Sequence, residues 1–236
     1  RETAPRRTTL TIFLVLMFLF ADLLLPQAID YEVELAEQHS VSLVTSMHSA
    51  SADTYIDEFN PTTNYNQSGT GYLGVSDAGF ESRLLFEFPM NFTSSSTVHS
   101  ATLNIVCDEN SLSSSDIIIY PASLSPWNSS TATWAQADIG TPWNTFGADG
   151  MSDRGAWEPP FRASTNGTFS LNVTGIAQEA ALSNESSVSL LLSALSSQYE
   201  CFLSDTTNLL DRPELILVTS TSAAGNGGSV ASGFAV

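Results

Sequence analysis

The sequence has 236 residues, of which 42% are hydrophobic, so the chain can bury a core and is not disordered throughout. Its formal net charge is −18, because 25 acidic residues face 7 basic ones, all of them arginine. This balance excludes nucleic acid as a partner, which needs clustered cations, and argues against docking on an anionic membrane surface. A salt-adapted protein and an ordinary acidic secreted protein fit the charge equally well.

The N-terminal region carries an apolar segment. Arg6 and Arg7 precede an apolar run from residue 10 to residue 25, and Ala28 is a small residue suited to cleavage. This pattern predicts an export signal over residues 1–28. An uncleaved signal anchor is the alternative, because the run is only slightly shorter than the roughly 20 residues of a membrane-spanning helix. We expect a spacer over residues 29–50, with a short helix or a first strand at residues 42–45 as alternatives.

Residues 51–220 carry the signal of a β domain. Short apolar runs recur there and end at turn residues such as Asn, Gly and Pro. The runs that we predict as strands are DTYID, GYLGVS, RLLFEF, ATLNIVC, DIIIYPA, TFSLNV, VSLLLSA, YECFLS and ELILVT. Residues 173–186 instead place apolar residues at helical spacing, with Thr174 as a cap. The pattern predicts an all-β fold, a jelly-roll β-sandwich of about 8–10 antiparallel strands with one short helix.

The last segment, residues 221–236, is rich in Gly, Ser and Ala and has no core-forming content. It is typical of a flexible linker, which would lead to a neighbouring domain, or of a frayed end.

The two cysteines, Cys107 and Cys201, lie in predicted strands. An even pair in an exported protein favours a disulfide between these strands. Two buried free thiols are the alternative.

Six Asn-X-Ser/Thr sequons favour a glycosylated surface protein, although a Ser/Thr-rich chain also produces sequons by chance. They begin at Asn66, Asn91, Asn128, Asn166, Asn172 and Asn184.

The sequence contains no motif of a catalytic machinery. It lacks a Gly-x-Ser-x-Gly elbow, a His-Glu-x-x-His helix motif and a phosphate-binding glycine loop. We therefore predict no catalytic residue. A polysaccharide-degrading enzyme, either a glycoside hydrolase or a lyase, is the alternative, because a hydrolase needs only two carboxylates at the right separation.

Oxygen-bearing side chains gather in the loop-rich stretch after residue 52. Asp53, Asp57 and Asn60 are candidate ligands of a structural calcium ion, which prefers several oxygen ligands on loops. Solvated loop carboxylates are the simpler explanation. We expect no other cofactor.

Four tryptophans fall within one long segment, residues 125–161. An exposed indole ring can stack on the apolar face of a sugar while neighbouring polar side chains bind its hydroxyls. Alternatively, the tryptophans anchor the segment to the sandwich, and Trp134 is the first candidate for this role. The candidate ligand-binding residues are Trp127, Trp143, Trp157, Asp153 and Arg154.

Ordered motifs across residues 50–221 resemble the DNRLRE domain, a family also described as carbohydrate-binding modules of the CBM96 group. The motifs are ADTYI at residue 52, RLLFEF at residue 83, SATL at residue 100, SPWNSSTATWAQA at residue 125, LNVTGIAQEA at residue 171 and RPELILV at residue 212. The resemblance implies a secreted or cell-surface jelly roll that accompanies polysaccharide-degrading enzymes or occurs in adhesin-like chains.

These observations together predict an exported, non-catalytic module. Its expected partner is an extracellular or cell-surface polysaccharide, or it serves as a structural or adhesion module. We expect it to be secreted or displayed on the cell surface, where the N-terminal apolar segment could act as a membrane anchor.

Overall fold

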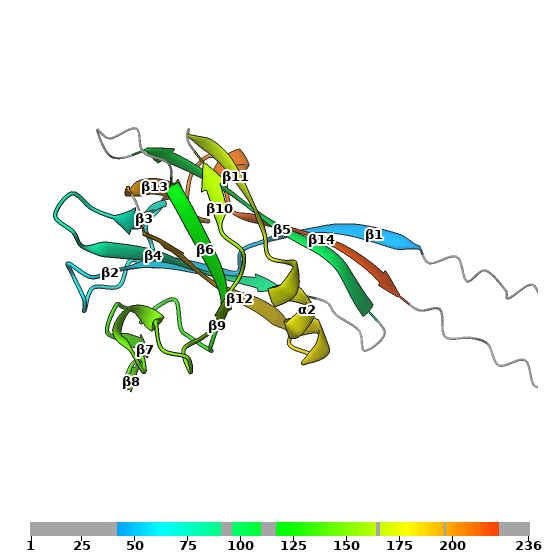
Figure 1. Cartoon of the computed structure of the whole chain (residues 1–236), viewed down its shortest axis with the longest axis horizontal. Coiled ribbons are helices and arrows are strands. Elements are labelled where there is room, and N and C mark those ends of the chain that lie inside the picture. The colour runs from blue at the N-terminus through cyan, green and yellow to red at the C-terminus, as the bar shows by residue number, and fades with distance from the viewer. Residues whose placement is uncertain (1–41, 91–95, 110–116, 164–165, 196, 222–236) are drawn as a thin grey trace, which may run out of the picture. The chain divides into compact units, whose positions relative to one another are not determined.

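The computed structural model describes residues 42–90, 96–109, 117–163, 166–195 and 197–221. These residues form fourteen strands, one α-helix and two short 3-10 helices (Figure 1). The strands pair antiparallel in two layers, so the predicted all-β sandwich is confirmed. Each of the nine predicted runs forms a strand. The signal or anchor segment over residues 1–28 and the tail beyond residue 221 lie outside the described residues.

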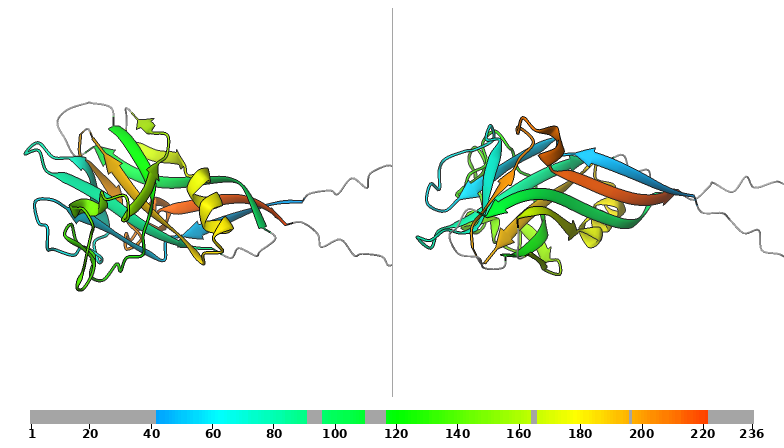
Figure 2. Two further views of the ribbon diagram at one scale, coloured as in Figure 1. Left: turned by 60° about the horizontal axis from the view of Figure 1, so that its bottom comes forward. Right: turned by 90° about the horizontal axis from the view of Figure 1, so that it is seen from above.

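The first layer is built around the long strand β5 (Ser96–Glu109). It pairs with β14 and β13 on one side and with β11 on the other, so that Leu103 stands opposite both Leu215 and Leu171. β1 extends this layer beyond β14, and the two strands run side by side in both views of Figure 2. The remaining strands of the layer are β1 (Leu43–Ser49), β3 (Thr70–Val75), β11 (Gly167–Asn172), β13 (Tyr199–Phe202) and β14 (Glu214–Thr221).

The second layer is built around β4 (Glu81–Pro89), which pairs with β2 and β12. β12 pairs in turn with β6, which carries β10 and β9 at its edge. β3 pairs with β13 in the first layer and with β4 in the second, and so connects the two. The remaining strands are β2 (Ala52–Asp57), β6 (Ile117–Leu124), β9 (Arg154–Trp157), β10 (Phe161–Ala163) and β12 (Ser187–Ala194).

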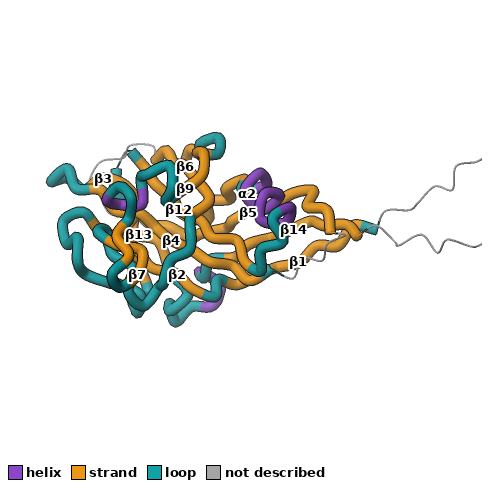
Figure 3. The backbone as a smooth tube through the Cα atoms, turned by 90° about the horizontal axis from the view of Figure 1, so that it is seen from below, coloured by secondary structure: helices purple, strands orange, loops and turns teal. Residues whose placement is uncertain are grey.

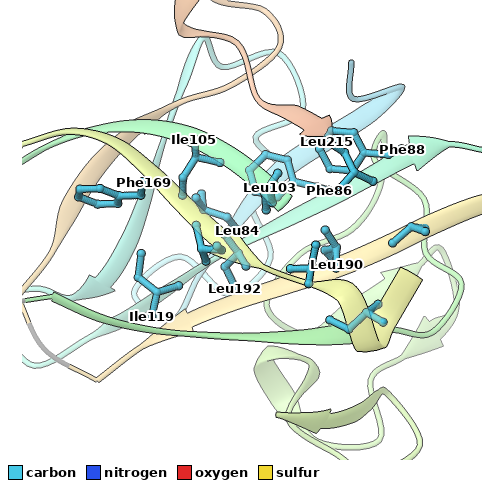
Figure 4. Packing of buried hydrophobic residues seen from close by; sticks show 14 of the residues in the cluster. Leu84, Phe86, Phe88, Leu103, Ile105, Ile119, Phe169, Leu190, Leu192 and Leu215 are labelled. Carbon is cyan, nitrogen blue, oxygen red and sulfur yellow. The ribbon is translucent and has the colours of Figure 1, made fainter. Parts of the chain in front are cut away.

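The core consists of two apolar clusters, which lie on the two faces of the central strands. Leu84 and Phe86 of β4 point into the main core between the layers, where Figure 4 shows them near Leu103 and Leu190. Leu85 points to the opposite face, where it joins a second apolar cluster with Trp134. Because successive side chains of a strand alternate in direction, one strand supplies both clusters. Both faces of β4 are therefore covered, the outer one by the tryptophan-rich segment.

The single described α-helix, α2 (Thr174–Leu182), packs against β5 and β12 (Figure 1). It buries Ile176, Ala177 and Ala180, which share one helical face. The predicted helix is confirmed, but its cap is not. Val173 occupies the N-cap position, and the Thr174 hydroxyl instead accepts a hydrogen bond from the backbone N–H of Ala101 at 3.0 Å.

The tryptophan-rich segment contains two short strands, β7 (Gln136–Asp138) and β8 (Thr141–Pro142), and the 3-10 turn η1 (Phe146–Ala148). A second 3-10 turn, η2 (Leu209–Asp211), precedes β14. The loops of the domain gather mainly at one end of the strands (Figure 3). No helix among the described residues is long and apolar enough to cross a bilayer.

The predicted spacer up to residue 50 is wrong in its last part, and the alternative of a first strand at residues 42–45 agrees better with the structure. Residues 43–49 form β1, and each of them is paired with a residue of β14. Most of its residues are exposed, so the strand lacks the alternating apolar pattern that reveals a half-buried strand in a sequence. The part of the spacer before residue 42 lies outside the described residues.

Candidate functional site

An open groove of about 390 Å³ lies where β2 and β3 meet their connecting loops. Its walls come from β2, the β2–β3 loop, β3, the β3–β4 hairpin turn and Gln198, the residue before β13. Its volume falls in the range of about 300–1,000 Å³ that is usual for ligand sites. The aromatic residues in its lining are Tyr55, Phe59, Tyr65, Tyr72 and Phe80.

The aromatic rings of this groove support one another. Tyr55 and Tyr65 stack with ring centroids 4.0 Å apart, and Tyr72 meets Tyr55 edge-on at 5.6 Å. Phe59 rests edge-on against Phe80 at 5.0 Å while 64% of its surface stays exposed. Such contacts hold aromatic rings in fixed orientations and add about 0.5–1.5 kcal/mol per pair. The groove therefore offers an exposed Phe59 ring beside a rigid tyrosine cluster.

Polar side chains line the groove next to the rings. Asp57 accepts hydrogen bonds from the amide of Asn60 at 2.9 Å and from the hydroxyl of Ser82 at 3.2 Å. Gln198 donates to the same Ser82 hydroxyl at 3.3 Å. This network connects the β2–β3 loop to β4 and to Gln198, the residue before β13, so a carboxylate and two amides are held at fixed positions.

The Tyr55 hydroxyl acts as a neutral hydrogen-bonding group. Burial raises the pKa of Tyr55 far above its ordinary value, and the adjacent Tyr65 and the charge of Asp57 raise this pKa further. A general base needs a hydroxyl that ionises near neutral pH. Tyr55 instead remains protonated, which suits it to hydrogen bonding rather than to proton abstraction.

Most of the tryptophans predicted to contact a ligand instead pack in or against the second apolar cluster. Trp143 is only 4% exposed, and its Nε1 donates to the Thr133 carbonyl at 2.8 Å, so its ring is a core element. Trp127 is half-buried against the same cluster, and its buried Nε1 has no hydrogen-bond partner among the described residues. Trp134 is buried too, as the anchoring alternative predicted.

Trp134 connects the tryptophan-rich segment to β4 by packing against Arg83. Its ring lies under the guanidinium of Arg83, with 5.3 Å between Cζ and the ring centroid. Gly147 adopts φ 77°, and a Cβ at this position would come within 2.7 Å of the indole. Only glycine satisfies both conditions. Arg83 also forms an ion pair with Glu81 at 2.7 Å.

Arg154 and Trp157, unlike the other predicted residues, lie together near the surface. The Arg154 guanidinium stacks on the Trp157 ring at 3.9 Å and also pairs with Asp149 at 3.0 Å. Asp153 adjoins them in sequence, but its buried carboxylate accepts backbone hydrogen bonds from Asn144, Thr145 and Gly150. Asp153 therefore shapes the loop, and the arginine already occupies one face of the Trp157 ring.

The candidate calcium ligands do not converge. Both carboxylate oxygens of Asp53 accept hydrogen bonds from Ser204, from its N–H at 2.7 Å and its hydroxyl at 3.0 Å. Asp57 and Asn60 do come together, but in the groove. Among the described residues, no group of three or more His, Cys, Asp or Glu side chains is placed to hold a metal. Calcium binding stays a prediction from the sequence.

Cys107 and Cys201 form a disulfide between β5 and β13. The two residues stand directly opposite each other in the strand register, with Cα atoms 4.0 Å apart. The disulfide predicted from the sequence is present, and both sulfur-bearing side chains are fully buried.

The sequons lie mainly on exposed positions. Asn128, Asn166, Asn172 and Asn184 are exposed and Asn66 is half-buried, whereas Asn91 lies outside the described residues. The side chain of Asn128 hydrogen-bonds Asp138, and that of Asn172 accepts from Thr174. Glycosylation of these positions stays a prediction.

Fold and groove define a class of protein: a disulfide-linked β-sandwich with an open aromatic surface site. Within that class, the chain belongs to carbohydrate-binding module family 96, whose family model matches residues 44–219. A search of curated proteins finds no significant match. The family match begins within β1 and ends within β14, so it spans both layers of the sandwich.

Sequence reasoning missed the aromatic groove. Ligand contact was assigned to the tryptophans, and none of Phe59, Tyr65, Tyr72 and Phe80 was predicted as a ligand-binding residue. A signal was nevertheless present, because Phe59, Tyr65, Tyr72 and Phe80 recur within a stretch that also carries the turn residues of two connections. Phe59, Tyr65 and Phe80 lie outside the predicted strands, so the strand pattern does not explain why aromatic residues occur there.

Proposed function

We propose that this chain is an exported, non-catalytic module that binds extracellular or cell-surface polysaccharide in the aromatic groove. The observation that carries the proposal is the exposed ring of Phe59 beside three tyrosines, a carboxylate and two amides. The apolar face of a pyranose ring can stack on such a phenyl ring, and its hydroxyls can pair with the polar groups. Membership of a carbohydrate-binding family supports the same ligand class.

The lining of the groove favours binding over catalysis. It contains one carboxylate, Asp57, whereas glycoside hydrolysis requires two. The raised pKa of Tyr55 argues against this residue as a general base. The groove is also open, whereas enzymes usually exclude water from the reacting bond.

The disulfide and the N-terminal apolar segment support export. A structural disulfide persists in oxidising compartments and is rare in the cytosol. Secretion, or display on the cell surface through an uncleaved anchor, would place the groove in contact with extracellular glycans. A linker at the C-terminal end would attach the module to an enzyme or adhesin domain.

The proposal is tested by measuring glycan binding of the full chain on a glycan array, followed by calorimetry on the best ligand. Phe59→Ala should weaken binding about tenfold, equivalent to about 1.4 kcal/mol, because it removes the stacking surface. Phe146→Ala is the matched control, since Phe146 is 65% exposed but lies in η1 of the tryptophan-rich segment.

Three outcomes would contradict the proposal. If Phe59→Ala binds as the wild type does while Trp157→Ala loses binding, the ligand lies on the Arg154–Trp157 surface. If no glycan binds at all, the module is structural or adhesive. A polysaccharide shortened by the wild-type chain would instead favour the enzyme alternative.

A further inference from the structure

The β2–β3 loop is fixed to the tryptophan-rich segment by hydrogen bonds. The side-chain amide of Asn64 donates to two backbone carbonyls of that segment, to Ser129 at 2.8 Å and to Ala132 at 2.7 Å. In the opposite direction, the backbone N–H of Ala135 donates to the Pro61 carbonyl at 3.0 Å. The two bonds from Asn64 span 65 and 68 residues of sequence, so they are tertiary contacts and not part of the loop's own turns.

The part of the loop that makes these bonds lies between residues that line the groove. Phe59 and Asn60 precede it, and Tyr65 of the tyrosine stack follows it directly. A turn in which the Thr63 N–H donates to the Asn60 carbonyl at 3.0 Å connects the two ends. A shift of this part of the loop would therefore move the exposed ring, an amide and a stacked tyrosine of the groove together.

The accepting carbonyls belong to a firmly anchored turn of the tryptophan-rich segment. Ala132 is fully buried, and its N–H donates to the Asn128 carbonyl at 2.7 Å. The next carbonyl, that of Thr133, accepts the hydrogen bond from the Trp143 indole. Trp134 is buried in the second apolar cluster. The buried tryptophans thus hold the surface to which the loop is fixed.

We propose that the tryptophan-rich segment supports the aromatic groove and that Asn64 is the positioning residue that holds the loop carrying Phe59 against it. This inference rests on the proposed function and concerns the same site. Asn64 is not among the residues that line the groove, so it acts without touching the ligand. Its amide nitrogen supplies two donors, one for each carbonyl. A ligand then meets a loop that is already ordered, and binding loses less conformational entropy.

Asn64→Asp tests the role of the amide. It keeps the size of the side chain and the oxygen that accepts from the Asn66 N–H, but it removes both donors. Calorimetry of the full chain with the best array ligand should show binding about threefold to tenfold weaker than in the wild type. Asn64→Ala, which removes the donors without adding a charge, is the second variant and should weaken binding in the same direction.

Asn172→Asp is the matched control for the charge change. It makes the same substitution at an exposed position of β11, where the side-chain oxygen accepts from the N–H and hydroxyl of Thr174. An aspartate accepts the same bonds, so the affinity for the glycan should stay as in the wild type.

Two further measurements distinguish positioning from a general loss of stability. Hydrogen exchange without glycan should speed up at the N–H groups of Thr63 and Ala135, which close the loop and join it to the segment, while amides of β5 keep their wild-type rates. Combined with Phe59→Ala, Asn64→Asp should reduce the affinity less than it does in the wild type, because the ring that it positions is already absent.

The outcomes separate this inference from the proposed function. Weaker binding of Asn64→Asp, with faster exchange confined to the loop and its contact, supports both. Wild-type affinity in this variant, unchanged exchange in the loop, or an equal loss with and without the Phe59 ring overturns the positioning role and leaves glycan binding standing. If the wild type binds no glycan, the proposed function is wrong and the inference falls with it.

Discussion

At the scale of single residues, the carboxylates of this acidic chain occupy two distinct environments. Asp53 and Asp153 are buried and accept backbone hydrogen bonds from the loops beside them. Asp57 stays at the surface and faces the groove. A sequence does not separate these environments, because the burial of a carboxylate and its hydrogen-bond partners depend on how the chain folds around it. Asp53, for example, meets Ser204 from 151 residues away.

Asp53 should give the stability of the domain a pH dependence of definite sign. Burial raises its pKa above the ordinary 3.8, and this outweighs the hydrogen bonds from Ser204, which lower it. The folded state therefore holds the proton more tightly than the unfolded chain does. The contribution of this group to the free energy of unfolding is full below pH 3.8 and is lost as the pH rises through the raised pKa.

The measurement is the free energy of unfolding in urea from about pH 3 to about pH 7 for the wild type and Asp53→Asn. The difference, wild type minus variant, should decrease as the pH rises through the pKa of Asp53. A difference that grows with pH would show that the hydrogen bonds from Ser204 dominate and that the pKa is lowered.

At the scale of elements, the β5–β13 pair carries the disulfide. The closed loop spans 94 residues, and the entropy of the unfolded chain that such a cross-link removes corresponds to about 4–5 kcal/mol. Replacing Cys107 and Cys201 together by Ala should lower the free energy of unfolding by about this amount. This difference in the free energy of unfolding is measured with guanidinium chloride in the absence of reductant, so that the wild type keeps its disulfide. A loss below about 1 kcal/mol would show that strand pairing alone organises this region.

The strands were predictable where apolar side chains alternate and were not where pairing alone forms the strand. The nine predicted runs contain the core residues of β4, β5 and β12. The alternation of apolar side chains in these strands predicts their burial. β1 is mostly exposed, and β9 includes the exposed Ala156. Both form because a neighbouring strand offers backbone hydrogen-bonding groups, β14 for β1 and β6 for β9. The local pattern therefore allowed a first strand at residues 42–45 only as an alternative to a spacer, and it did not predict β9.

At the scale of the whole molecule, the net charge of −18 should make stability depend on salt. Repulsion among the acidic residues opposes the compact state and is screened as ionic strength increases. The midpoint of thermal unfolding should therefore rise between about 0.02 M and about 0.5 M sodium chloride. A midpoint that is flat or falls over this range would show that local ion pairs, such as Arg83 with Glu81, outweigh the overall repulsion.

The fold and family could be read from the sequence far better than the site could. Apolar runs in the sequence predicted the positions of nine strands. The ordered motifs indicated the carbohydrate-binding family, which the family match confirms. The groove depends on tertiary structure, because β3 and β13 bring Tyr72 and Gln198 beside the loop that carries Phe59. The prediction for Trp143 shows the same limit, since its burial depends on the Thr133 carbonyl and on a cluster beneath β4.

The central claim, that the aromatic groove binds a glycan, is tested most directly by a crystal structure of the chain with its best array ligand. We predict density for a sugar ring stacked on Phe59, with its hydroxyls within hydrogen-bonding distance of Asp57, Asn60 or Gln198. Density over Trp157 and Arg154, with the groove containing only solvent, would contradict the account.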